Sequence, residues 1–201
     1  MIIFFYAKVF NIYGMEQFSK LKPGKLTSEE DKVIFKDGHM SIIKYDGWNI
    51  LKEKDGIICI PYLIELNQII IRQEYIPSYK YADGQDYHLA LVGGGIEPGE
   101  SPEEALLREL QEEGGIVLRD NFHIEFEKPL FVGKSTSNKY YPCILPLTEN
   151  DYHEVMVKGD GSRYEQMSQT AKIDIKYLNS LNASDVITEY MLDKFKKYLN
   201  L

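Results

Sequence analysis

Acidic residues and glycines are concentrated in one short stretch of this 201-residue chain. Glu109, Glu112 and Glu113 follow closely after Gly93-Gly94-Gly95, and Arg108 precedes the first of them. Residues spaced i, i+3 and i+4 share one face of a helix, so the three carboxylates would lie together. Neighbouring carboxylates repel one another unless a cation lies between them. Because Mg²⁺ prefers oxygen ligands, the pattern indicates a divalent-metal site.

The residues around the glutamates predict the helix that must position them. Ser101 is a good N-cap, Glu104 completes a capping box, and Gly114-Gly115 ends the helix. We therefore expect a helix over residues 102–113.

The opposite face of this predicted helix is apolar and should pack on a sheet. Leu106, Leu107 and Leu110 lie on that face. The preceding glycines have no side chains that would obstruct a ligand, so their carbonyls can ligate a metal and their backbone can approach a phosphate.

The spacing of these residues is that of a known motif, G-x5-E-x7-R-E-U-x-E-E-x-G-U, in which U is aliphatic. Its fixed positions are filled by Gly94, Glu100, Arg108, Glu109, Leu110, Glu112, Glu113, Gly115 and Ile116. The chain therefore resembles the Nudix hydrolase superfamily. The alternative is a capped amphipathic helix with a solvated acidic face, which nine matching positions make improbable.

The resemblance implies a set of site residues and a cofactor, Mg²⁺, with Mn²⁺ as a substitute. The implied metal ligands are the Gly93 carbonyl, Glu100 (a ligand or an orienting group), Glu109, Glu112 and Glu113. Arg108 would hold Glu109 in register, and Glu165 would deprotonate the attacking water. Glu154 and Asp160 are alternative bases.

Sequence outside the motif resembles the ADP-ribose pyrophosphatase branch of the superfamily. The similar segments are Gly47–Glu53 and Ile69–Pro77, and Pro129 is close to a downstream proline typical of the branch. Two positions depart from the pattern: Val92 precedes the glycines where the branch often has Pro-Ala-Gly, and Tyr75 replaces a second arginine.

Five residues are candidates for substrate binding: Trp48, Arg72, Tyr75, Gly94 and Gly95. Trp48 would stack on a base or lie in a core or interface. Arg72 would clamp a phosphate or carboxylate, or be a surface charge on a strand. Tyr75 would contact the ligand or anchor a loop.

The implied reaction is hydrolysis of the diphosphate in a nucleoside diphosphate linked to another group. ADP-ribose or a related ADP-sugar is the expected substrate, giving AMP and a phosphorylated product. NADH or capped RNA are alternative substrates. A non-catalytic sensor of ADP-ribose-type ligands is the alternative of another class, and the intact motif argues against it.

The predicted fold is α/β, a Nudix-type α/β/α sandwich with a mixed central sheet. Residues 1–50 are expected to form a small N-terminal β-rich extension that builds a homodimer, and residues 51–201 the Nudix domain. The elements expected from the pattern are strands at 32–36, 40–45, 87–92, 124–132, 140–147 and 173–178, a hairpin of 57–64 with 68–75, and a helix over 184–199.

Composition limits the partners and the compartment. The net charge of −8 makes nucleic acid an unlikely partner, apart from an RNA 5′ end. Cys59 and Cys143 are expected to be buried thiols, which favours a reducing, cytoplasmic location. We expect no membrane span and no signal peptide, and translation starts at Met1 or Met15.

Overall fold

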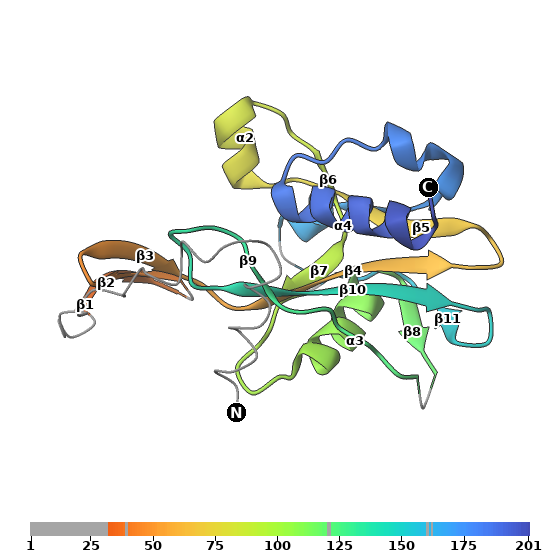
Figure 1. The fold of residues 1–201 in the computed structure, drawn as a ribbon, viewed down its shortest axis with the longest axis horizontal. Coiled ribbons are helices and arrows are strands. Elements are labelled where there is room, and N and C mark those ends of the chain that lie inside the picture. The colour runs from red at the N-terminus through yellow and green to blue at the C-terminus, as the bar shows by residue number, and fades with distance from the viewer. Residues whose placement is uncertain (1–31, 39, 120–121, 160, 162) are drawn as a thin grey trace, which may run out of the picture.

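The fold is organised around a seven-stranded mixed sheet with helices on both faces (Figure 1). The computed structural model describes residues 32–38, 40–119, 122–159, 161 and 163–201. The strand order is β12-β5-β4-β10-β9, with β6 added to β5 and β7 to β4. These strands are β4 (Gly56–Leu63), β5 (Gln68–Glu74), β6 (His88–Ala90), β7 (Val92–Gly95), β9 (Leu130–Phe131), β10 (Lys139–Leu147) and β12 (Gln169–Asp174).

The central strand β4 is buried along its whole length because both faces of the sheet are covered. Ile57 and Cys59 belong to the core beneath α3 (Pro102–Glu112), whereas Ile58 and Ile60 belong to the core beneath α4 (Val186–Tyr198). Because successive side chains of a strand point to opposite faces of the sheet, the continuous apolar run of β4 contributes to both cores. The predicted α/β sandwich is confirmed.

The two cysteines face each other on neighbouring strands. β10 pairs with β4 in parallel, and Cys59 lies opposite Cys143. Both are free and buried, as predicted, and burial raises the pKa of the Cys59 thiol.

A separate three-stranded sheet extends from one end of the central sheet (Figure 1). It consists of β1 (Lys32–Asp37), β2 (Met40–Tyr45) and β3 (Trp48–Lys52). Leu51 ties it to the main sheet: its N–H donates to the Ser135 carbonyl at 2.8 Å, and its carbonyl accepts from Ser137 N–H at 3.0 Å. The predicted strands at 32–36 and 40–45 are confirmed; the rest of the proposed extension, residues 1–31, lies outside the described residues.

The helix that carries the acidic motif forms as its caps predict. Ser101 Oγ accepts from Glu104 N–H, and the Glu104 carboxylate accepts from Ser101 N–H, so both capping-box hydrogen bonds are present. The predicted packing face was wrong for one residue: Leu107 is 41% exposed, and Ala105 joins Leu106 and Leu110 in the core.

Three predicted strands differ from the observed ones. The expected strand at 87–92 is two strands, because β6 pairs with β5 and β7 pairs with β4. Of the expected strand at 124–132, only Leu130–Phe131 pairs, with the start of β10. The late strand ends at Asp174, whose carboxylate caps the 3-10 helix η4 (Ile175–Ser180).

Four short elements were not predicted. Helix α2 (Pro77–Asp83) has Pro77 in its first turn and Gly84, with a φ of 80°, at its C-cap. Strand β8 (Ile116–Leu118) pairs with β11 (Tyr152–Glu154), and a 3-10 helix, η3, spans Glu165–Met167. Within the described ranges, no helix has the length and apolarity needed to span a membrane.

Candidate active site

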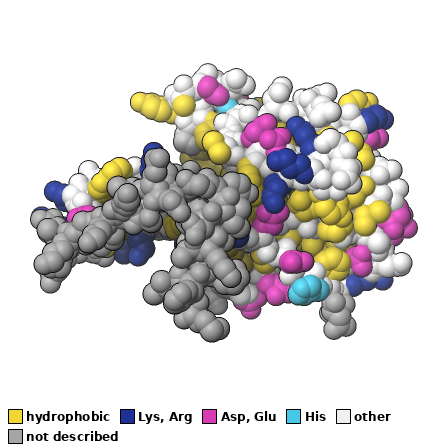
Figure 2. Space-filling view, in the orientation of Figure 1, with side chains coloured by type: hydrophobic (Ala, Val, Ile, Leu, Met, Phe, Trp, Pro, Cys, Tyr) yellow, Lys and Arg dark blue, Asp and Glu magenta, His cyan; other side chains and the backbone are white. Residues whose placement is uncertain are grey.

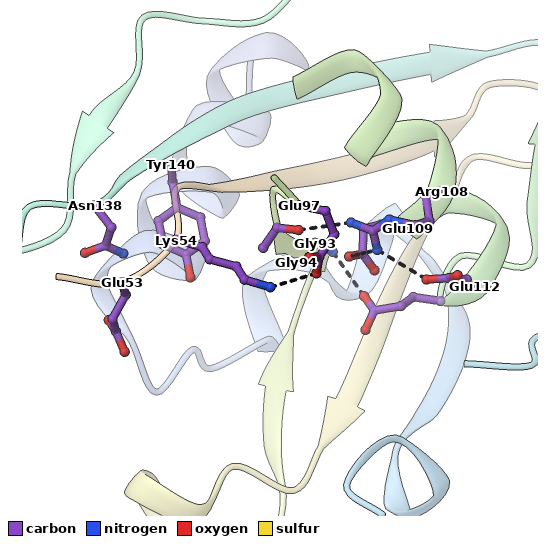
Figure 3. Close-up of a pocket in the computed structure, with 12 residues that line it drawn as sticks. Glu53, Lys54, Gly93, Gly94, Glu97, Arg108, Glu109, Glu112, Asn138 and Tyr140 are labelled. Atoms are coloured by element: carbon purple, nitrogen blue, oxygen red, sulfur yellow. Dashed lines mark hydrogen bonds and ion pairs between the residues drawn. The ribbon is translucent and has the colours of Figure 1, made fainter. Parts of the chain in front are cut away.

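Helix α3 and strand β7 border a cavity of about 350 Å³ (Figure 3). Its lining comes from these two elements, from the segment after β3 and from the start of β10. The lining residues are Glu53, Lys54, Gly93, Gly94, Gly95, Glu97, Arg108, Glu109, Glu112, Glu113, Asn138 and Tyr140. The structure thus brings together most of the residues that the motif predicted.

The glycines are required because helix and strand lie so close together. A Cβ atom on Gly94 would lie 2.0 Å from Glu109 Oε1, and one on Gly93 would lie 2.5 Å from the Ile57 carbonyl. The first contact would displace the Glu109 carboxylate, and the second would displace the neighbouring strand β4. The glycine strand therefore forms a wall against which the glutamate oxygens lie.

Arg108 is the organising cation of the cavity. Its Nη1 lies 2.6 Å from Glu109 Oε1 and 3.3 Å from Glu112 Oε2. Its Nε and Nη2 bind the Glu100 carboxylate at 3.0 and 3.1 Å, and Nη2 also donates to the Gly95 carbonyl at 3.0 Å. The Glu100 carboxylate raises the pKa of Arg108, and Arg108 lowers that of Glu100. Of the two roles expected for Glu100, its position here is that of an orienting group.

Two of the motif glutamates are not solvated. Glu109 and Glu113 are each 6% exposed. Burial raises the pKa of Glu109, and it raises the pKa of Glu113 to about 9 despite the attraction of Arg72. The alternative of a merely solvated acidic face does not describe this helix.

Arg72 is paired with Glu113 and does not line the first cavity. It is buried, and its Nη2 lies 3.1 Å from Glu113 Oε1 while its Nε lies 2.6 Å from Glu74 Oε1. Its Nη1 also donates to Thr170 Oγ1 at 3.2 Å. The guanidinium therefore holds the second buried glutamate much as Arg108 holds the first. Arg72 also borders a smaller cavity of about 230 Å³ next to the loop at 157–168.

The chemistry of the first cavity fits a hard divalent cation. The described residues of its lining include five glutamates but only two basic side chains, Lys54 and Arg108, so a diphosphate would meet excess negative charge there. The donors are carboxylate and backbone oxygens, the ligands that Mg²⁺ prefers. Among the described residues, no three acidic, histidine or cysteine side chains already converge as a metal cluster. Glu109 and Glu113 are instead each paired with an arginine.

Trp48, Tyr75 and Glu154 are not among the described residues that line this cavity. Trp48 is 59% exposed on β3 in the small sheet. Tyr75 stacks on Tyr164 with ring centroids 6.0 Å apart. Glu154 pairs with Lys172, Glu165 begins η3, and Asp160 lies outside the described residues.

Several lining residues were missed by the sequence analysis. Lys54 Nζ lies 2.8 Å from Glu97 Oε1 across the cavity, and Figure 3 shows Glu53, Asn138 and Tyr140 beside one another at the opposite end from Arg108. Glu97 fills a variable position of the motif, and Asn138 belongs to no motif, so neither carries a signal in a single sequence. Asn138 is 5% exposed, and its Oδ1 has no hydrogen-bond partner in the described part of the chain. Such an unpaired buried group costs about 1–3 kcal/mol.

Comparison with known proteins agrees with this geometry. A family model described as NUDIX domain matches residues 59–157. With the complete motif, the sandwich fold and the site built on it, this places the chain in the Nudix superfamily.

Two similar proteins differ in the compounds that their names mention. The chain is 40% identical over 73 residues to an 8-oxo-dGTP diphosphatase of Haemophilus influenzae, covering 32% of this chain and 54% of that protein. It therefore spans about half the length of this curated relative. A solved structure titled as that of an ADP compounds hydrolase matches with a TM-score of 0.61 and 19% identity, covering 90% of this chain and 98% of that one. At that identity the likeness shows the fold alone.

The buried Arg72–Glu113 pair gives a prediction about stability. Replacing Arg72 with Met removes the buried partner of both Glu113 and Glu74, so Arg72→Met should lower the free energy of unfolding by about 1–3 kcal/mol. Adding Glu113→Gln should restore part of that loss. Urea denaturation measures both.

The matched control is Lys172→Met, which breaks the exposed Lys172–Glu154 pair and should cost about 1 kcal/mol or less. Equal losses for the two single variants would contradict the assigned role of Arg72.

Proposed function

We propose that this chain hydrolyses the diphosphate of a nucleoside diphosphate linked to another group, with ADP-ribose or a related ADP-sugar as substrate. The products would be AMP and a phosphorylated second product. The observation that carries the proposal is the single cavity in which Glu109, Glu112 and Glu113 lie against the glycine strand β7. The excess of carboxylate in that cavity suits a cation-assisted reaction on phosphates.

The site residues take their proposed roles from this arrangement. Glu109, Glu112, Glu113 and the Gly93 carbonyl would hold Mg²⁺ or Mn²⁺, with Glu100 in support. A cation bound there neutralises charge on the diphosphate and lowers the pKa of a bound water. Arg108 keeps the Glu109 carboxylate against the glycine strand, and Gly94 and Gly95 leave room for the phosphates. Lys54, held by Glu97, is placed to bind a phosphate oxygen at the cavity wall.

The general base is proposed to come from the late loop. Gly159 N–H donates to the Glu112 carbonyl at 3.1 Å, and Val155 N–H donates to the Gly115 carbonyl at 2.9 Å. These hydrogen bonds fasten the loop to the end of the motif helix, which supports a base from this region. Glu165 is our first choice to accept the proton of the attacking water, and Glu154 and Asp160 are the alternatives.

The choice of an ADP compound has support outside the motif. The strand β5 and the segment around Trp48 resemble the ADP-ribose pyrophosphatase branch, and the fold matches a structure titled as an ADP compounds hydrolase. The partial match to an 8-oxo-dGTP diphosphatase favours a second candidate, an oxidised nucleoside triphosphate. NADH and capped RNA remain further candidates, and the complete motif argues against a non-catalytic sensor.

A substrate panel with motif variants tests the proposal. The protein is incubated with Mg²⁺ or Mn²⁺ and ADP-ribose, ADP-glucose, NADH, 8-oxo-dGTP or capped RNA, and products are identified by mass spectrometry. We expect AMP from ADP-ribose. Glu112→Gln and Glu113→Gln should each lower kcat by at least about a hundredfold, because each removes a charged oxygen donor.

The matched control is Glu103→Gln, which makes the same change at an exposed position of the same helix and should leave kcat unchanged. Circular dichroism verifies that all variants are folded. Full activity in both Glu112→Gln and Glu113→Gln would contradict the proposed role of these glutamates as metal ligands. Tight ADP-ribose binding with no turnover would favour a non-catalytic sensor.

We further propose that the small sheet forms a homodimer interface. Val33, Ile34 and Phe35 on its edge strand β1, and Trp48 on β3, are large hydrophobic residues that are exposed in the single chain. Figure 2 shows hydrophobic and charged side chains mixed on the part of this sheet that is visible. An exposed edge strand has unpaired backbone N–H and C=O groups, and its apolar side chains favour contact with another chain. A second copy would also provide a way for Trp48 to approach a substrate cavity, as its predicted base-stacking role requires.

Sedimentation equilibrium tests the dimer. The wild-type protein should have twice the 23.3 kDa mass of the chain, and Phe35→Glu should shift it toward the monomer. Tyr177→Glu introduces the same charge at an exposed aromatic on η4 and should leave the dimer intact. A wild-type protein that sediments as a monomer refutes this proposal.

A further inference from the structure

A second cavity of about 540 Å³ adjoins the one that holds the motif glutamates. The two cavities share Glu53, Asn138 and Tyr140 in their linings. The second cavity then extends between β9 and the N-terminal end of α4, with Phe131 on one side and Ile187 on the other. A ligand whose phosphates lie against the glycine strand can therefore continue into it.

The walls of the second cavity suit a flat, uncharged ring. Tyr79, Tyr140, Tyr190 and Phe131 contribute aromatic rings, and most of the remaining surface is apolar. Flat bases stack on such side chains without regard to their identity. The residues described in the lining include no lysine or arginine, so they are not suited to a second phosphate.

The charged groups that the structure describes in this cavity accept hydrogen bonds. Its charged side chains are the carboxylates of Glu53 and Asp185. Asp185 is fixed in place as the N-cap of α4, because its Oδ1 accepts from Ile187 N–H at 2.9 Å and Thr188 N–H at 2.8 Å. A ring that carries hydrogen-bond donors is therefore favoured over one that presents carbonyl oxygens.

Asn138 indicates which chemical group a ligand in this cavity should carry. It lies where the two cavities meet, and Figure 3 shows its amide beside the Tyr140 ring. The residue is buried, yet its Oδ1 has no partner among the residues described. An unpaired buried acceptor is unfavourable in a folded protein unless something else supplies the donor. At this position, the donor would come from a molecule in the cavity.

We propose that the second cavity binds a nucleobase with an exocyclic amino group and that Asn138 accepts a hydrogen bond from that group. The proposal rests on the proposed function, because the base must be joined to the diphosphate bound by the first cavity. It makes Asn138 a specificity-determining residue. Adenine, guanine and cytosine carry the required amine, whereas hypoxanthine and uracil present a carbonyl oxygen instead.

Paired ligands that differ only at this group test the proposal. Calorimetry measures the Kd of AMP and of IMP without divalent metal, so the comparison does not depend on catalysis. Kinetics then compare kcat/KM for ADP-ribose and its hypoxanthine counterpart, IDP-ribose. We expect the wild-type protein to favour the amino form about tenfold or more in both measurements, because the carbonyl form leaves Asn138 unpaired.

Asn138→Leu should abolish this preference through weaker binding of AMP, with IMP binding little changed. It should not lower the thermal midpoint, since an apolar side chain of similar size removes an unpaired buried group. Asn150→Leu is the matched control at an exposed turn and should keep the preference. Phe131→Ala changes a largely exposed ring, so the fold should tolerate it, and it should weaken AMP and IMP alike by about tenfold.

The possible outcomes separate this inference from the proposed function. If diphosphates are hydrolysed but Asn138→Leu retains the wild-type preference, the inference is wrong and the function stands. If Trp48→Ala abolishes AMP binding while Asn138→Leu and Phe131→Ala do not change it, the base binds elsewhere and the inference is again wrong. If no diphosphate is hydrolysed, the proposed function fails, and the AMP and IMP measurements decide the role of the cavity alone.

Discussion

The burial of two carboxylates at the junction of α3 and the sheet is the constraint on which this structure depends. Glu109 and Glu113 are held out of water, and burial raises the pKa of each. Arg108 binds Glu109 and Arg72 binds Glu113. These ion pairs do not balance the cavity as a whole, where five glutamates face two basic side chains. A divalent cation would offset most of this excess negative charge, and without one a diphosphate would be repelled.

The rest of the fold keeps that junction in place. Strand β4 is buried on both faces and pairs with β7, which brings the glycines beside the motif helix. Leu106 and Leu110 fix the helix on the sheet, and the capping box fixes its first turn. The division between β6 and β7 also helps to place the glycines beside the helix. The chain leaves its pairing with β5 at the end of β6 and pairs with β4 along β7, which contains the glycines. The loop after β11 is fastened to the end of α3 by the hydrogen bond from Gly159 N–H to the Glu112 carbonyl.

Much of this was predictable because the relevant signals are local. The N-cap at Ser101 and the spacing of the glutamates define the motif helix, and the apolar runs around Asn67 define the β4–β5 hairpin. Leu107 was misplaced because the leucines alone do not show which edge of the helix faces the sheet. The remaining errors depend on long-range pairing: β8 forms only because β11 returns to it.

The sequence also did not predict which groups the charged and polar site residues contact. Arg72 looked like a phosphate clamp, but its contact with Glu113 joins positions far apart in the chain. Asn138 carries no motif, and its significance arises from where two cavities meet. Predicting such residues from one sequence would require knowledge of the tertiary contacts themselves.

The most direct test of the account is the binding of Mn²⁺ to the free protein, followed by electron paramagnetic resonance. The account predicts that the signal of the hydrated ion is lost as the wild-type protein is added, and that binding is strongly weakened in a Glu109→Gln, Glu112→Gln, Glu113→Gln triple variant that remains folded. A signal that is unchanged by the wild-type protein, or equal binding by both proteins, would contradict it.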